Sequence, residues 1–304
     1  MLTIDGSFGE GGGQILRSSL ALSLLTQTPF RISKIRAGRS RPGLMRQHLT
    51  AVRAAAEISD AEVSGAEIGS TEVVFHPKAI RAGDFSFATG GAGSTTLVFQ
   101  TVLYPLLLGT SASSTVRFEG GTHNPMAPPF DFLNDAFLPQ LRKMGANVEL
   151  ALISHGFYPA GGGAWTAAIH PSAHLSRLDL LERGEIRAKR ALALVAQISG
   201  AIAVREIDAF IAKVGWDRNE GRPHVIRSAH GPGNALVATI ESEHVTEVFT
   251  GFGERGVSAE RVAESVADEV TRYLRIGAPV GEHLADQLLL PMALGSGGSF
   301  HTVA

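Results

Sequence analysis

The chain has 304 residues, of which 44% are hydrophobic, and its formal net charge is -2 at pH 7. This length and composition predict a large buried core in two domains, or in one domain with an insertion. Because the chain has no cysteine, disulfides, thiolate catalysis and Cys-ligated zinc are excluded. The longest apolar run, residues 97–108, is too short to span a membrane, and residues 1–6 lack the features of a signal peptide. We therefore expect a cytoplasmic protein that contacts no membrane, in which any site for a polyanion must be local.

A glycine-rich turn at residues 9–14 precedes the apolar, helix-like run 15–25, and the chain repeats this arrangement twice. The copies are residues 90–95 before the run 97–108, and residues 277–281 before the run 283–294. Glycines permit positive φ and close backbone approach, and the first amides of a helix favour an anion. The repetition predicts related units whose helix starts face one phosphate-rich site.

A run of cationic residues follows the first helix, and no acidic residue occurs in it before Glu57. The run comprises Arg31, Lys34, Arg36, Arg39, Arg41 and Arg46. Such a run is most often a solvated face. Here, however, arginine predominates, and its guanidinium suits bidentate contact with phosphate, on a Gly/Pro loop that follows a strand. The pattern favours phosphate binding, and residues 42–43 (Pro-Gly) predict the start of the next helix, which runs to residue 56.

Three further polar residues stand out around the glycine-rich turns. Arg17 lies in the first turn of a helix, where a cation opposes the helix dipole unless an anion is bound there. Glu10 lies among glycines, where most carboxylates are simply solvated but where this one is well placed for a hard divalent cation. Gln100 lies inside an apolar run, where its amide must find partners or cost about 1–3 kcal/mol.

The element pattern predicts an α/β (α+β) protein with internal repeats. Strand, helix, strand, helix, strand, strand is expected twice before residue 178, the second copy with a helix at residues 130–144. From residue 179 to residue 276 the pattern changes to a smaller α/β unit, with strands at 189–198 and 234–243 and helices at 204–214 and 258–274. We expect a large domain, residues 1–178 and 277–304, with the small domain 179–276 inserted into its third repeat.

Helical spacing in the last repeat places His283 beside Asp286 and Gln287 on one surface. Together with three earlier segments, this helix resembles the motifs of RNA 3'-terminal phosphate cyclases, in the same order and over Asp5 to Phe300. The motifs are GEGGGQILR at residues 9–17, the IRAGR loop with its Pro-Gly-Leu and Arg-Gln-His at residues 35–48, HGFYPAGGG at residues 155–163, and LADQ at residues 284–287.

The resemblance implies three βαβαββ repeats with a small inserted α/β domain. It also implies an ATP-dependent ligase reaction. ATP adenylates an enzyme histidine, AMP passes to an RNA 3'-phosphate, and the vicinal 2'-OH displaces AMP to leave a 2',3'-cyclic phosphate. The implied partner is RNA that ends in a 3'-phosphate, and a homodimer stays open.

The resemblance further implies which residues form the site. The ATP contacts fall on Gln100 and on the helix residues His283, Leu284, Ala285, Asp286 and Gln287. The ligand of a divalent cation, Mg or Mn, falls on Glu10. Phosphates of ATP or of the RNA end fall to Arg17, Arg36, Arg39 and Gln47. The nucleophilic histidine of the family lies beyond the position of Ala304, and the spacing of His301 does not match it. Phe249 and Phe252 are both candidates for stacking on adenine.

Two other protein classes stay open. The same repeat architecture resembles that of the enolpyruvyl transferases of aromatic and cell-wall synthesis. These enzymes need no ATP, so nucleotide-dependent self-labelling of this chain would exclude them. A non-catalytic, cyclase-like scaffold of ribosome assembly is favoured by the position of the nucleophile. It is disfavoured by the presence of Glu10, the arginines and the Leu-Ala-Asp-Gln helix.

Overall fold

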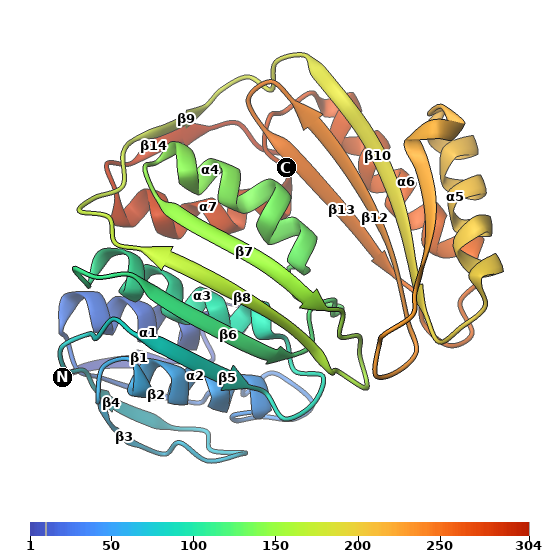
Figure 1. The fold of residues 1–304 in the computed structure, drawn as a ribbon. Helices are drawn as coiled ribbons and strands as arrows, with labels where there is room; N and C mark the ends of the chain where they lie inside the picture. Colours follow the sequence, from blue (N-terminus) through green and yellow to red (C-terminus); the bar gives the residue numbers. More distant parts are fainter. Residues whose placement is uncertain (10, 304) are drawn as a thin grey trace. The chain divides into compact units, whose positions relative to one another are not determined.

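The computed structural model of the chain describes residues 1–9 and 11–303 and shows a mixed α/β protein (Figure 1). Its contacts divide into two compact units. Unit 1 contains residues 1–121, 146–153 and 164–173, and unit 2 contains residues 122–145, 154–163 and 174–304. No helix of the described residues is long and apolar enough to cross a membrane.

Two four-stranded sheets belong to unit 1, apart from the end residues Ser154 and Gly163. In spatial order the first contains β1 (Leu2–Asp5), β2 (Phe30–Ser33), β4 (Val73–His76) and β3 (Glu62–Ser64). The second contains β5 (Asp84–Ala88), β6 (Ser114–Gly120), β8 (Gly163–His170) and β7 (Asn147–Ser154). The first two strands are parallel in each sheet. The two sheets therefore share one strand order, first, second, fourth and third.

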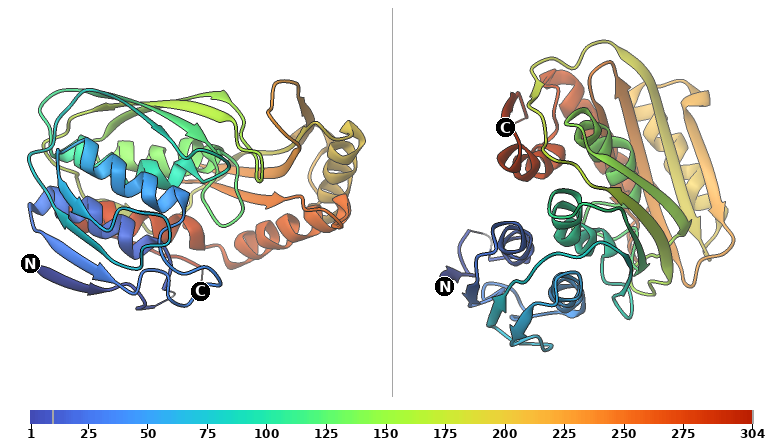
Figure 2. Two further views of the ribbon diagram at one scale, coloured as in Figure 1. Left: turned by 90° about the horizontal axis from the view of Figure 1, so that it is seen from below. Right: turned by 60° about the vertical axis from the view of Figure 1, so that its left-hand side comes forward.

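Three helices of unit 1 pack against one another: α1 (Gln14–Thr26), α2 (Arg46–Glu57) and α3 (Thr95–Leu108), as Figure 2 shows. Leu16, Leu20 and Leu24 of α1 are fully buried, as the spacing i, i+4, i+8 on one helix face requires. Nearly all of α3 is buried, which explains why its sequence is apolar on every face. The helices expected at 15–25 and 97–108 are thus confirmed.

The start of α2 differs from the expectation. The helix begins at Arg46 and not at residues 42–43, because Gly43 has a φ of +79° and belongs to the preceding loop. A Cβ atom at Gly43 would lie 2.2 Å from the carbonyl oxygen of Gly69, so this glycine is required by a close backbone contact. Pro-Gly therefore marks a tight loop here, and the helix follows it.

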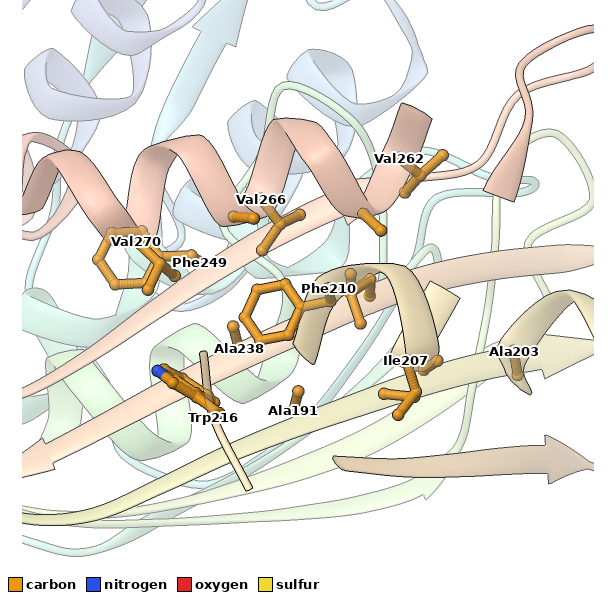
Figure 3. Close-up of a cluster of buried hydrophobic side chains, with 14 of the residues drawn as sticks. Ala191, Ala203, Ile207, Phe210, Trp216, Ala238, Phe249, Val262, Val266 and Val270 are labelled. Carbon is orange, nitrogen blue, oxygen red and sulfur yellow. The ribbon is translucent and has the colours of Figure 1, made fainter. Parts of the chain in front are cut away.

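Unit 2 contains a four-stranded sheet in the order β11 (Gly221–Ile226), β10 (Ile186–Ala196), β12 (Gly233–Ser242) and β13 (Thr246–Phe252). β10 is parallel to β11 and antiparallel to β12, which is antiparallel to β13. One face packs on α5 (Gly200–Val214) and α6 (Ala259–Ile276), around Phe210, Trp216 and Phe249 (Figure 3). The strands and helices expected between residues 189 and 274 are all present.

The rest of unit 2 consists of shorter elements. The helix expected at residues 130–144 begins as a π-helical segment, η1 (Phe132–Phe137), and continues as α4 (Leu138–Lys143). β9 (Leu178–Leu180) pairs in parallel with β14 (Gly298–Phe300). In the sequence, α7 (Glu282–Leu294) lies between α6 and β14. The short helix η2 (Arg218–Glu220) leads into β11.

Candidate functional site

The start of α1 follows the first glycine-rich turn and has no side-chain cap. Its N-cap residue is Gly13, and no acidic residue lies in its first turn. Gly9 and Gly11 have φ values of +63° and +57°, which favour glycine, and a Cβ atom at Gly9 would meet nothing within 4 Å. The first amides of α1 thus lie beside an open turn, which is the arrangement that binds anions. Glu10, the expected metal ligand, lies outside the described residues.

Cationic side chains approach this turn from two directions. An Arg17 Nη1 atom lies 3.0 Å from the position that a Cβ atom of Gly13 would take, and an Arg39 Nη2 atom lies 3.4 Å from the corresponding position at Gly12. Arg36 and Arg17 both act electrostatically on His48, so the third expected arginine belongs to the same cluster. The structure therefore gathers Arg17, Arg36 and Arg39 around the start of α1.

His48 of α2 completes the cluster and is a neutral group. Its side chain is 5% exposed, and its Nδ1 atom accepts a hydrogen bond of 3.3 Å from the Met45 amide. Burial, followed by repulsion from Arg36 and Arg17, lowers the pKa of His48 to about 3. Because Nδ1 is an acceptor, the proton of the neutral ring is on Nε2, and this atom lies 2.3 Å from the position of a Gly13 Cβ. Only glycine fits beside this N–H donor.

Arg36 also has a structural role that the sequence did not indicate. Its φ is +55°, and its Nη1 atom donates to the carbonyl oxygens of Arg41 at 2.6 Å and Gly43 at 2.9 Å. Burial, then repulsion from Arg39, lowers the pKa of Arg36 below its ordinary value. One guanidinium nitrogen therefore closes the loop, while the cluster still carries its charge.

Two members of the cationic run are neutralised elsewhere. Arg31 forms an ion pair of 2.6 Å with Glu72, and Lys34 forms one of 2.8 Å with Asp5. Both partners come from other strands or their ends, so the run itself could not reveal them. Phosphate binding is therefore expected only for those residues of the run that lie in the loop.

The second glycine-rich turn is bound to α2. The Gln47 Oε1 atom accepts a hydrogen bond of 3.0 Å from the Ser94 amide, and Arg46 donates to the carbonyl oxygen of Gly90. Ser94 caps α3 by accepting from the Leu97 amide at 3.3 Å. The start of α3 is thus occupied by protein groups, and Gln47 lies where two turns meet.

Gln100 lies on the same helix, α3, and is half-buried among fully buried neighbours. Its position in unit 1 places it on the helix that follows the second glycine-rich turn. The other residues expected to contact the nucleotide are on α7, which belongs to unit 2.

The start of α7 is occupied by a carboxyl group. The Gly281 amide donates to the Glu247 Oε1 atom at 2.6 Å, and Glu247 is 2% exposed. Burial raises the pKa of Glu247 to about 8, although the hydrogen bond from Gly281 opposes the shift. The expectation that all three helix starts present amides to one phosphate site is therefore corrected for α3, whereas for α7 it stays a prediction.

The five expected nucleotide contacts on α7 differ in exposure. His283 and Asp286 are exposed, Ala285 and Gln287 are half-buried, and Leu284 is fully buried, so Leu284 packs in the core. The Gln287 Nε2 atom donates to Asp286 Oδ2 at 3.4 Å, which places the two polar groups side by side.

A small pocket of about 30 Å³ lies at the start of α7. It is lined by His283 together with Glu247, Phe249, Tyr273 and Val303, among others. Of the two candidates for stacking on adenine, Phe249 therefore lies beside His283. Phe249 is only 7% exposed and packs against Tyr273, with ring centroids 5.4 Å apart. His301 has an exposed side chain and pairs through its backbone with Val280 and Leu180.

No group of three or more histidine, aspartate or glutamate side chains in the described part of the chain could hold a metal ion. Sequence reasoning missed two buried groups, Glu247 and the neutral state of His48. Glu247 had a signal, since it is a single carboxylate inside the apolar strand segment 245–249. The state of His48 had none, because it depends on arginines from other elements.

Comparisons with known proteins agree with the resemblance. The family model described as RNA 3'-terminal phosphate cyclase matches residues 8–304. An RNA 3'-terminal phosphate cyclase of Ralstonia nicotianae is 56% identical over 303 residues, which is 99% of this chain and 86% of that protein. One of Koribacter versatilis is 52% identical over 303 residues, 100% of this chain and 85% of that protein, and one of Pseudomonas aeruginosa is 53% identical over 302 residues, 99% and 87%. With the motifs and the cationic turn at α1, these matches show that the chain belongs to the RNA 3'-terminal phosphate cyclase family.

Proposed function

We propose that this chain catalyses the ATP-dependent conversion of an RNA 3'-terminal phosphate to a 2',3'-cyclic phosphate. The name shared by its relatives supports the substrate and the product. The observation that carries the proposal is the cluster at the uncapped start of α1. There, Arg17, Arg36 and Arg39 meet an open glycine-rich turn. A site of fixed cations and amides is what a reaction between phosphates requires.

Each residue of the cluster has a proposed task. Arg17 and Arg39 hold phosphate oxygens, and Arg36 adds charge while its Nη1 atom fixes the loop. The neutral His48 donates an N–H to an oxygen and adds no charge that would repel the arginines. Gln47 holds the second turn in place through Ser94.

The nucleotide is proposed to bind through the α7 residues His283, Asp286 and Gln287, with Leu284 and Ala285 shaping the helix beneath. Gln100 of unit 1 is proposed as a further contact on the family resemblance alone. Glu10 is proposed to hold Mg or Mn, which would neutralise phosphate charge. The donor set fits a nucleotide, because it combines arginines, amide groups and an imidazole at an open turn.

The proposed chemistry follows the family. A histidine C-terminal to Ala304 accepts the adenylyl group as pyrophosphate leaves, and the RNA 3'-phosphate then takes the adenylyl group. The vicinal 2'-OH attacks that phosphorus, its proton departs, and AMP is the leaving group. The need for a 2'-OH would select RNA over DNA.

We also infer that the fold consists of three βαβαββ repeats, the third interrupted by the small α/β domain at residues 179–276. The equal strand order of the two sheets of unit 1 supports two such repeats. The pairing of β9, at the start of that region, with β14, which follows it, supports an insertion between them.

The test uses RNA that ends in a 3'-phosphate and ATP labelled at the α-phosphate, with a chain extended beyond Ala304 through the family's histidine segment. We expect an acid-labile label on the protein, and we expect RNA with a 3'-phosphate to remove it. RNA with a 3'-OH, or with a 2'-deoxy terminal nucleotide, serves as the control and should give no cyclic product. ATP binding without label or product in the extended chain would favour the scaffold alternative instead.

A further inference from the structure

A cationic segment in unit 2 has no part in the site described above. Residues 221–233, which form β11 and the following turn, contain two arginines and two histidines and no acidic residue. Arg222, His224, Arg227 and His230 are all exposed. β11 is an edge strand of its sheet, with β10 as its partner.

The arginines of this segment differ from Arg205 and Arg218 of the same unit, which form ion pairs. Arg205 pairs with Glu260 at 2.7 Å, and Arg218 pairs with Asp208 at 3.1 Å. Neither Arg222 nor Arg227 has a carboxylate within ion-pair distance among residues 1–9 and 11–303. Their charge is therefore not neutralised by the described protein.

The cations of β11 lie on the face away from α5. A Cβ atom at Gly221 would lie 2.4 Å from Ile211 of α5, so this position faces the helix. Because side chains alternate along a strand, Arg222 and His224 face the other way. Burial, then repulsion from His123 and from His224, lowers the pKa of His155 to about 4, with Asp131 opposing. The electrostatic effect of His224 on His155 agrees with a position of His224 near the turn that starts at His155.

The turn that starts at His155 packs on the end of the cationic segment. Cβ atoms at Gly162 and Gly231 would each lie 2.3 Å from an atom of the other turn, namely His230 Cγ and Ala160 Cβ. The base of the turn is fixed by the Gly156 amide, which donates to Thr122 Oγ1 at 2.9 Å. Tyr158, at the tip of this turn, is 67% exposed. An exposed aromatic side chain therefore lies on a turn that contacts the end of the cationic segment.

We propose that β11, the turn after it and Tyr158 form a binding surface for single-stranded RNA. Arg222 and Arg227 contact phosphates, His224 and His230 donate hydrogen bonds, and Tyr158 stacks on a base. Unpaired cations beside an exposed aromatic group match a single strand, whose phosphates and unstacked bases are both accessible. The surface binds the strand away from its terminal phosphate, so this inference rests on the proposed function.

The first test measures binding of a fluorescent single-stranded RNA of about twenty nucleotides without a 3'-phosphate, by anisotropy at several salt concentrations. For single strands, each phosphate contact contributes about 0.7 to the slope of log affinity against log salt. We expect Arg222→Ala with Arg227→Ala to lower the slope by about 1.4, and Tyr158→Ala to weaken binding about tenfold with an unchanged slope. The matched control, Arg205→Ala with Arg218→Ala, removes the same charge from paired arginines and should leave the slope unchanged.

The second test compares turnover of this RNA, carrying a 3'-phosphate, with that of a dinucleotide 3'-phosphate. The double variant should raise KM for the long RNA about tenfold and leave the dinucleotide unaffected, because only the long RNA has further nucleotides beyond its reacting end. The proposed RNA-binding surface would be overturned by any of three results. These are an unchanged salt slope in the double variant, an equal decrease of the slope in the control variant, or an equal rise in KM for the dinucleotide. Turnover is measured in the chain extended beyond Ala304; if that chain, without the substitutions, turns over neither RNA, the proposed function fails, while the binding slopes still decide on the surface.

Discussion

The starts of α1 and α7 both follow glycine-rich segments, yet they solve the problem of unpaired amides in opposite ways. At α1 no acidic residue lies in the first turn, and Arg17 and Arg39 approach the turn with positive charge. At α7 the buried Glu247 accepts the hydrogen bond of Gly281. A helix start surrounded by cations needs an anion from outside, whereas one with an internal carboxyl group does not. Among the described residues, the first turn of α1 therefore keeps a net positive charge for an anion, whereas an internal carboxyl group lies at the start of α7.

Of the substitutions that test the difference between the two helix starts, Gly13→Ala at α1 is expected to lower nucleotide affinity most. The new Cβ would lie 2.3 Å from His48 Nε2 and 3.0 Å from Arg17, so it would displace the groups that face the anion. We expect nucleotide affinity to fall about a hundredfold, with about 1–3 kcal/mol lost from the free energy of unfolding through overpacking. Titration calorimetry and thermal unfolding measure the two quantities.

Gly38→Ala is the matched control for Gly13→Ala. Gly38 lies in the arginine loop, and a Cβ there would meet nothing within 4 Å. Its affinity and stability should stay near those of the unaltered chain. Equal losses in the two variants would show that the loops respond to any added methyl group, and the cradle at Gly13 would have no special role.

A smaller effect is expected from Arg39→Ala. A hydrogen bond between charged groups contributes about 1.5–3 kcal/mol, so phosphate binding should weaken about ten- to a hundredfold with little change in melting temperature. Arg31→Ala is the control, because Arg31 is already paired with Glu72 on an exposed surface. Normal affinity with a lowered melting temperature in Arg39→Ala would make Arg39 a structural residue.

The last prediction concerns stability alone, because the effect of Glu247→Gln depends on pH and is near zero at pH 4.5. Because the folded pKa of about 8 is raised above the ordinary value of 4.5, the folded state holds a proton that the unfolded state has lost between these values. The free energy of unfolding must therefore fall as pH rises through this window, by about 1.4 kcal/mol per pH unit. Glu247→Gln removes this decline, so its stability relative to the unaltered chain should grow from pH 4.5 to pH 8.

Glu206 provides the control for Glu247. It is also buried, its Oε2 atom accepts from Asn234 at 2.8 Å, and burial raises its pKa to about 7. Glu206→Gln should gain relative stability only up to about pH 7, so between pH 7 and pH 8 only Glu247→Gln continues to gain. Denaturant unfolding at half-unit intervals of pH would measure both curves. A flat difference for Glu247→Gln would mean that its carboxyl group is ionised at the start of α7.

Local patterns were sufficient where one element determines the outcome. The spacing of Leu16, Leu20 and Leu24 predicted the buried face of α1, because a helix face is defined by its own residues. Phosphate binding was predicted for the arginine loop and for the glycine-rich turn, and it stays a prediction. The structure brings Arg17 and Arg39 beside that turn. The motifs that carried the family resemblance are likewise short segments that can be recognised without knowledge of tertiary contacts.

Other features depend on partners that are distant in the sequence. Only the folded chain pairs Arg31 with Glu72, places Gln47 against Ser94 and buries Glu247 beneath Gly281. These contacts decide which charges and helix starts remain accessible to a ligand. The sequence by itself thus determined the helices, the family and the arginines of the candidate site. Tertiary structure alone decided which of those groups are already neutralised, because electrostatic and hydrogen-bond partners are set by distance in space and not along the chain.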